Sequence, residues 1–70
     1  MIKTSYDPEA DALTMRLGPD GAYVESDEVA PGVILDFDAP GNVIGIEVLD
    51  AGLRAAGRYA APARKRAAAE

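Results

Sequence analysis

The sequence predicts an α+β protein, a small antiparallel β-meander of four to five strands with one C-terminal helix packed on one face. Two observations support this fold class. Through residues 1–50, short runs of alternating apolar and polar residues are separated by Pro, Gly and Asp, as in strands joined by turns. After Asp50 the composition becomes Ala-rich and helical. We therefore expect one compact domain over residues 1–60, followed by a flexible, basic, Ala-rich tail at 61–70.

The first two strands are expected in MIKTSY and DALTMRL, joined by a four-residue hairpin loop over residues 7–10. With Tyr6 opposite Asp11, apolar side chains such as Leu13 fall on one face and Lys3 falls on the other. This clean sorting supports the register, because a slip by one residue would move every side chain to the opposite face.

A turn at GPDG, residues 18–21, precedes a third and weaker strand within AYVESDEV. Its polar composition indicates an edge strand or a bent, partly irregular segment.

The segment GVILDFDAPGNVIGIEVLD predicts a second hairpin, with Asp38 opposite Val43 and a type II turn centred on Pro40 and Gly41. Alternation then gives the hairpin two unlike faces. One is wholly apolar and is expected to form the core: Val33, Leu35, Phe37, Ile44, Ile46 and Val48. The other mixes acidic and apolar residues: Ile34, Asp36, Asp38, Val43, Gly45, Glu47 and Leu49.

The helix is expected to begin after Asp50 as N-cap, to pack Leu53 against the sheet, and to end at Pro62. Gly52 and Gly57 each weaken a helix by up to about 1 kcal/mol relative to Ala, so the helix depends on this packing. The positive charges of this part of the chain form one basic cluster. It comprises Arg54, Arg58, Arg64, Lys65 and Arg66.

Composition limits the function classes. Residues 1–50 carry 11 acidic and 2 basic residues, a net charge of −9, whereas residues 51–70 carry 5 basic and 1 acidic, a net charge of +4. The acidic body would repel nucleic acid. The chain has neither Cys nor His, so disulfides, thiolate metal sites and the commonest general base are excluded. No segment resembles a membrane span or a signal peptide, and we expect a cytoplasmic protein.

YDPEADAL at 6–13 and PGVILDFDAPGNVIGIEVLDA at 31–51 resemble a small bacterial family of unknown function, the one numbered 2283. The resemblance implies a compact meander of antiparallel strands with a C-terminal helix and brings no established activity. Some members are encoded beside small toxin-like proteins, which implies an antitoxin-like role as one option. Pro40 before Gly41 and the basic extension beyond Tyr59 depart from the family pattern.

The leading functional hypothesis is a non-enzymatic protein-binding module, antitoxin-like or regulatory, that needs no cofactor. Its partner would be another protein, such as a toxin-like neighbour, and the chain itself is expected to form a homodimer because so short a domain has a thin core. The candidate partner-binding residues lie on the mixed face and in the tail. They are Ile34, Asp36, Asp38, Glu47, Leu49, Arg64, Lys65 and Arg66.

The alternative is a carboxylate site in which Asp36, Asp38 and Glu47 converge to hold Mg²⁺ or Ca²⁺ or to act as an acid/base pair. Solvated carboxylates on an outward face are the commoner outcome of this pattern. Gly45 opposite Asp36 is expected to let that side chain pack closely over the strand. Asp7 and Asp11 are expected to stabilise their turn rather than to act in catalysis.

Overall fold

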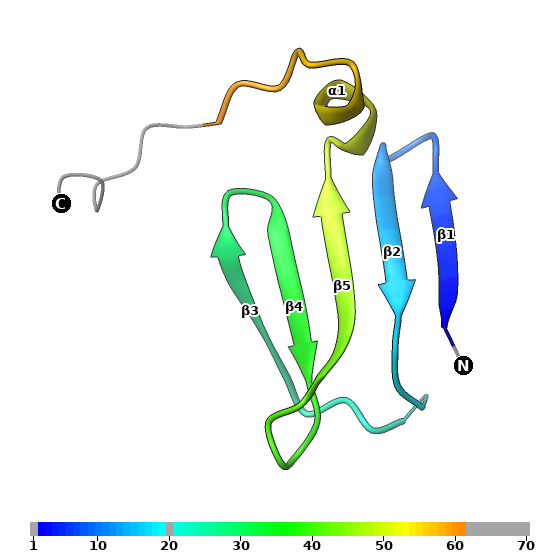
Figure 1. The fold of residues 1–70 in the computed structure, drawn as a ribbon, viewed down its shortest axis with the longest axis vertical. Helices are drawn as coiled ribbons and strands as arrows, with labels where there is room; N and C mark the ends of the chain where they lie inside the picture. Colours follow the sequence, from blue (N-terminus) through cyan, green and yellow to red (C-terminus); the bar gives the residue numbers. More distant parts are fainter. Residues whose placement is uncertain (1, 20, 62–70) are drawn as a thin grey trace, which may run out of the picture.

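The computed structural model describes residues 2–19 and 21–61 of the chain. It contains a single antiparallel sheet of five strands and one short helix, which confirms the predicted antiparallel sheet of four to five strands followed by a helix (Figure 1). The elements are β1 (Lys3–Asp7), β2 (Ala12–Arg16), β3 (Glu25–Ala30), β4 (Val33–Phe37), β5 (Val43–Leu49) and α1 (Ala51–Ala55). Most of the predicted tail, including Arg64, Lys65 and Arg66, lies outside the described residues.

The strand order is β1-β2-β5-β4-β3, so only part of the sheet is the predicted meander. β3, β4 and β5 follow one another as neighbours, but β5 also pairs with β2 and thereby joins two hairpins into one sheet. The chain between β2 and β3 passes the end of the sheet opposite α1 (Figure 1). It is fixed there because the N–H groups of Leu17 and Gly18 both donate to the carbonyl of Ile44, at 2.8 and 3.1 Å.

The first hairpin has the predicted faces but not the predicted register. Tyr6 pairs with Leu13 and Asp7 with Ala12, so the loop comprises residues 8–11 rather than 7–10. Asp11 adopts a left-handed conformation with φ 53°, which Asp tolerates better than most residues and which ends the loop one position later. Because the register moves by two residues, each side chain remains on its expected face.

The second hairpin has the predicted register through most of its length, with Ile34 opposite Glu47 and Asp36 opposite Gly45. The predicted turn is wrong by one residue, since the N–H of Gly41 donates to the carbonyl of Asp38 at 3.0 Å. A register shift follows, and Val43 pairs with Phe37 instead of Asp38. Val43 therefore moves from the expected mixed face to the side of Phe37, because opposed residues share a face.

β3 is an edge strand, as predicted, and its side chains are exposed except at Ala30. A bulge between Glu28 and Ala30 disturbs its pairing with β4. Bulges and charged side chains are common means of keeping an edge strand from pairing with another chain.

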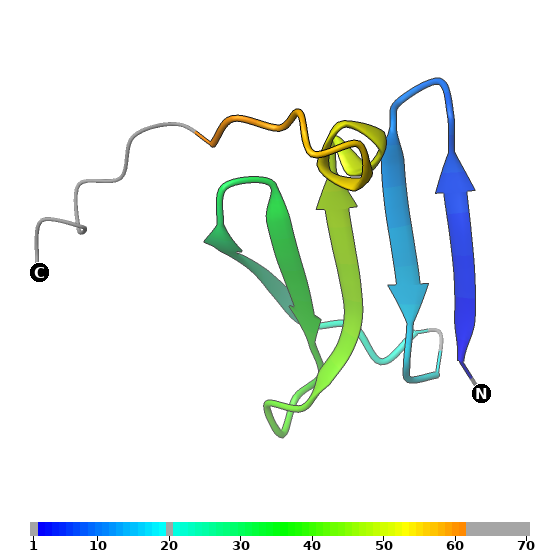
Figure 2. The ribbon, with the colours of Figure 1, turned by 45° about the horizontal axis from the view of Figure 1, so that its top comes forward.

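The helix differs most from expectation. It spans only Ala51–Ala55 and lies at the end of the strands, and none of its residues is buried (Figure 2). Leu53 is 44% exposed, so the prediction that it is buried against the sheet is wrong. Gly57, with φ 72°, follows Ala56 and supports the left-handed turn that ends the helix earlier than predicted.

The described chain is consequently one layer thick. Its extents are 34 × 32 × 15 Å, and the turned view shows no second layer of elements over the strands (Figure 2). Within residues 2–19 and 21–61, the buried hydrophobic residues are Ala12 and Ile44 alone. Because stable domains bury the apolar face of a sheet against another layer, this architecture leaves a face that needs a cover.

Candidate functional site

The apolar residues of four strands meet on one broad face of the sheet. Strand pairing places them in rows, because directly opposed residues share a face. One row runs Thr4, Met15, Ile46, Leu35, Asp27, and the next runs Tyr6, Leu13, Val48, Val33, Ala30. We call this surface, with Phe37 from the end of β4, the apolar face.

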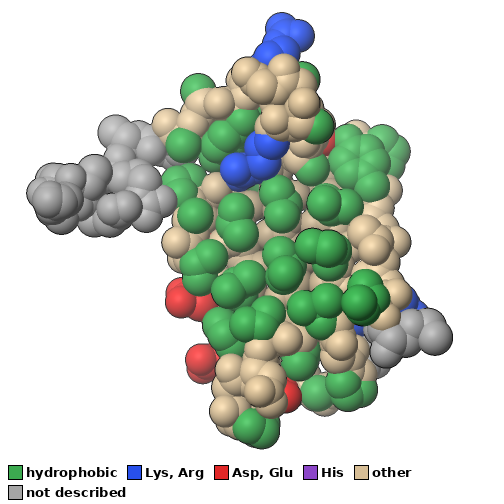
Figure 3. Space-filling view, viewed as in Figure 1, with side chains coloured by type: hydrophobic (Ala, Val, Ile, Leu, Met, Phe, Trp, Pro, Cys, Tyr) green, Lys and Arg blue, Asp and Glu red, His purple; other side chains and the backbone are tan. Residues whose placement is uncertain are grey.

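The apolar face is extensive and uncovered by the described part of the chain. Figure 3 shows hydrophobic side chains spread almost continuously across the strands. The central members, such as Leu35, Ile46 and Val48, are only half-buried, and Tyr6 at one margin is 49% exposed. Contiguous apolar patches of this breadth usually mark a protein–protein or membrane contact.

Charges are confined to the margin of the apolar face. In the two rows, the only charged residue is Asp27, and it lies on edge strand β3. Glu25, opposite Phe37, is also on β3. The centre is therefore suited to an uncharged, apolar surface rather than to a highly charged ligand.

The opposite face, which we call the mixed face, carries half of the residues predicted to bind a partner. Pairing places Ile34 beside Glu47 and Asp36 beside Gly45, and Leu49 opposes Ala12 on the same side. The four predicted residues among these, Ile34, Asp36, Glu47 and Leu49, are half-buried. The structure therefore brings four of the eight predicted residues onto one surface, while Arg64, Lys65 and Arg66 fall outside the described residues.

Asp38 lies one residue beyond the end of β4, in the turn that leads to β5. Its carboxylate accepts hydrogen bonds from the backbone N–H of Asn42 at 2.7 Å and from Asn42 Nδ2 at 3.1 Å. The first of these bonds is the main reason that the pKa of Asp38 lies below its ordinary value. The carboxylate stabilises the turn, and the predicted convergence of Asp36, Asp38 and Glu47 is wrong.

Asp36 packs over the strand beside it, as predicted. A Cβ placed on Gly45 would lie 2.9 Å from Asp36 Oδ2 and 3.3 Å from its Cβ, so the missing side chain is the space that Asp36 occupies. Within residues 2–19 and 21–61, no group of three acidic side chains is arranged to hold a metal ion. The mixed face thus offers contact surface rather than a carboxylate centre.

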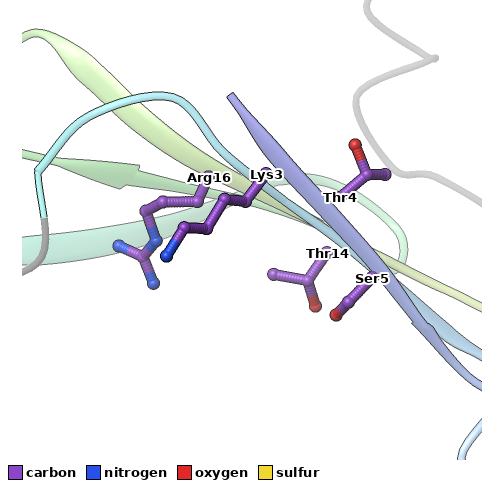
Figure 4. Close-up of a pocket in the computed structure, with 5 residues that line it drawn as sticks. All are labelled: Lys3, Thr4, Ser5, Thr14 and Arg16. Carbon is purple, nitrogen blue, oxygen red and sulfur yellow. The ribbon is translucent and has the colours of Figure 1, made fainter. Parts of the chain in front are cut away.

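A depression of about 430 Å³, lined by Lys, Arg, Ser and Thr residues, lies on the mixed face at the margin formed by β1 and β2 (Figure 4). Lys3 and Arg16 are directly opposed across the two strands, with Ser5 and Thr14 opposed in the next row. Like charges in this position repel each other. The predicted register separated Lys3 from Arg16 by two residues, and so sequence reasoning missed this pair.

Two side chains to which the sequence analysis gave other roles fix α1 to the end of the sheet. Asp11 Oδ1 accepts hydrogen bonds from the Tyr6 hydroxyl at 2.5 Å and from the Gly52 N–H at 2.7 Å. These two bonds, the Tyr6 bond first, hold the pKa of Asp11 below its ordinary value. Asp50, the expected N-cap, has φ 56° and makes no side-chain capping bond, so Asp11 supplies the cap from another loop.

Arg54 is the second of these side chains. Its Nε donates to the carbonyl of Leu49 and its Nη2 to the carbonyl of Pro31, both at 2.7 Å. The guanidinium also lies 3.8 Å from the ring centroid of Tyr59. Arg54 therefore joins α1 to the β3–β4 turn, and it is not available to the basic cluster in which the sequence placed it.

The fold and its surfaces define a small, single-layer antiparallel-sheet protein with one uncovered apolar face. Residues 3–51 match the family model described as protein of unknown function (DUF2283), and the chain belongs to that family. The comparisons with curated proteins and with solved structures found no match. Among the described residues, no helix has the length and hydropathy needed to cross a membrane.

Proposed function

We propose that the protein is a non-enzymatic protein-binding module whose contact surface is the apolar face. The observation that supports this most strongly is the breadth of that face, which runs across the sheet from β1 to β4, combined with the absence of a covering element in the described residues. Leaving such a surface in water is unfavourable, by about 25 cal/mol for each Å² of apolar area. Binding of a protein surface would remove that cost.

The chemistry of the two faces supports binding over catalysis. The apolar face carries no nucleophile, base or cation in its central positions, and the carboxylates of Asp11 and Asp38 are engaged in hydrogen bonds within the fold. Catalytic sites combine a reactive group, a partner that activates it and a means of stabilising charge. An antitoxin-like or regulatory role fits this proposal, since binding alone would then change the activity of the partner. A cytoplasmic location belongs to the same proposal, because a chain without Cys needs no oxidising compartment.

The experiment is a quantitative affinity capture with three baits: the wild type, Leu35→Asp and Ile34→Asp. The two substituted residues are neighbours on β4 and point to opposite faces, so each variant places the same charge on a different surface. We expect a partner that is retained by the wild type and Ile34→Asp but lost with Leu35→Asp. Circular dichroism checks that each bait is folded, and the milder Ile46→Thr replaces Leu35→Asp if that bait is not.

If Leu35→Asp retains the partner and Ile34→Asp loses it, the binding site lies on the mixed face instead. Absence of any specific partner for the wild type would contradict the proposed function.

A further inference from the structure

We infer that the apolar face is covered by the same face of a second copy, giving a two-fold dimer in which two sheets form a β-sandwich. This inference deepens the proposed function and rests on it, since it names the occupant of the same surface. It also gives the expected homodimer a specific contact surface, the apolar face.

The first argument is that the described chain has too little interior to be stable as one layer. A sheet becomes a stable domain by packing its apolar face on another layer, and among residues 2–19 and 21–61 only Ala12, Ile44 and Gly45 are buried. The helix that could have supplied the layer spans five residues and buries none of them. The cover must therefore be present wherever the protein is folded, and a second copy of the chain meets that requirement.

The second argument is area. A standard stable interface buries about 800 Å² on each partner. Five strands of five to seven residues give a sheet of roughly 20 Å on each side, so an interface of standard size would use the whole apolar face and its margins. Two sheets packed face to face lie about 10 Å apart, which leaves room for the interdigitated side chains of both apolar faces.

The third argument is that the face is complementary to itself. In a two-fold interface the same patch meets its own copy, so a charge near the centre would meet a like charge. The central positions are Leu13, Met15, Val33, Leu35, Ile46 and Val48, all uncharged. Asp27 and Glu25 lie at the β3 margin, where water can solvate them.

The sandwich leaves the mixed face of each copy outward. Ile34, Asp36, Glu47 and Leu49 then remain accessible on both sides of the dimer, together with the depression beside Lys3 and Arg16. A dimer built in this way presents two identical outer surfaces.

The test combines sedimentation equilibrium of the full chain with thiol labelling of two single-cysteine variants. Because the protein has no cysteine, Val48→Cys places one thiol on the apolar face and Glu47→Cys places one on the mixed face of the same strand. Val48→Cys is a small change in volume, so the variant should keep the fold. The probe is a maleimide added across a series of protein concentrations.

We expect a dimer, with labelling of Val48→Cys slowed roughly tenfold at concentrations well above the dissociation constant, because reaction then requires dissociation. Glu47→Cys should be labelled at the same rate at every concentration. A monomer would overturn the inference, whether its Val48→Cys thiol is reactive or protected. A dimer that protects Glu47→Cys instead would also overturn it, by placing the interface on the mixed face.

These results separate the inference from the proposed function. A monomer that still captures a partner through Leu35 would remove the dimer and leave the binding module. A dimer whose apolar face is protected, and whose capture experiment yields no other protein, would limit the proposed binding function of that face to self-association.

Discussion

The carboxylate of Asp11 accepts a hydrogen bond from the backbone N–H of Gly52 at 2.7 Å, although 41 positions separate the two residues. The N–H of Ala51 also donates to the carbonyl of Asp11, at 3.0 Å. The first-turn amides of α1 are thus satisfied by the loop between β1 and β2. A helix of five residues would not persist in water by itself, so this anchor decides where the chain goes after the sheet.

We predict that Asp11→Ala frees α1 from the sheet, because it removes the acceptor and also places Ala at φ 53°. The backbone amide of Gly52 should exchange much faster with solvent, and the Tm should fall. Asp11→Asn is the matched variant, since its Oδ1 can still accept and Asn tolerates the left-handed conformation. Equal exchange at Gly52 in both variants and the wild type would contradict the assigned cap.

The acid side of the stability profile should depend on Asp11 and Asp38. Their folded-state pKa values lie below the ordinary 3.8 because of the hydrogen bonds to Tyr6 and Gly52, and to Asn42, respectively. The stabilisation that these hydrogen bonds provide is complete at pH values above the pKa of the unfolded state. It is lost as the pH falls through the lowered pKa values of the folded state. Urea denaturation at a series of acid pH values should show this decline, and Asp11→Asn should make it shallower.

Because of Tyr6, we expect the free energy of unfolding to decline at alkaline pH as well. Its pKa is raised above 10.0, chiefly by its hydrogen bond to Asp11. The associated stabilisation is therefore complete below the unfolded value and is lost as the pH rises through the folded one. Tyr6→Phe should remove this alkaline decline, measured as the free energy of unfolding, while a decline that persists unchanged would have to come from another group.

Gly18→Ala should destabilise the fold by about 1–3 kcal/mol, the usual cost of adding a methyl group to a close-packed site. The new Cβ would lie 2.7 Å from Cγ2 and 2.8 Å from Cβ of Ile44, which is 4% exposed and cannot easily move. Gly45→Ala is the comparison, because its nearest atom is Asp36 Oδ2, at the end of a movable side chain. Denaturant midpoints should fall more for Gly18→Ala than for Gly45→Ala.

Replacing Arg54 by Ala should lower the free energy of unfolding by about 1.5–3 kcal/mol, because the part-buried carbonyls of Leu49 and Pro31 lose a charged hydrogen-bond donor. Arg54→Lys should recover only part of this loss, since an ammonium group cannot reproduce the planar fork or its stacking on Tyr59. Exposed Arg58 provides the control, and Arg58→Ala should leave the denaturant midpoint nearly unchanged. Equal effects at the two positions would contradict the role given to Arg54.

The strands and their faces could be predicted because alternation of apolar and polar residues is a local signal. The register from Val33 opposite Val48 to Asp36 opposite Gly45 follows from that alternation. The loop of the first hairpin and the turn at Asp38 differ in position from the prediction because loop carboxylates accept hydrogen bonds from nearby backbone amides. Asp7 accepts from the N–H of Glu9, and Asp38 accepts from the N–H of Asn42. Alternation cannot report such bonds, since it constrains only which face a residue occupies.

The candidate surface was predicted less well for a different reason. The apolar residues were recognised, but the cover assigned to them was a helix through residues 51–61, which in the structure ends at Ala55. Gly52 and Gly57, within an Ala-rich segment, already indicate in the sequence that the helix is weak. The roles of Asp11 and Arg54 depend on contacts between distant segments, and no local pattern indicates them.

The position of β5 between β2 and β4 sets the order in which the chain can fold. The β1–β2 hairpin and the β3–β4 pair each involve residues close in sequence, so each can form as soon as it leaves the ribosome. The bridge between them requires Ile46 to meet Met15, and β5 is the last strand to be synthesised. Until then, β2 and β4 both expose unpaired backbone groups toward the place that β5 will fill. During synthesis, nascent chains should therefore be most prone to mispairing just before Leu49 emerges, and completion of β5 closes both open edges at once.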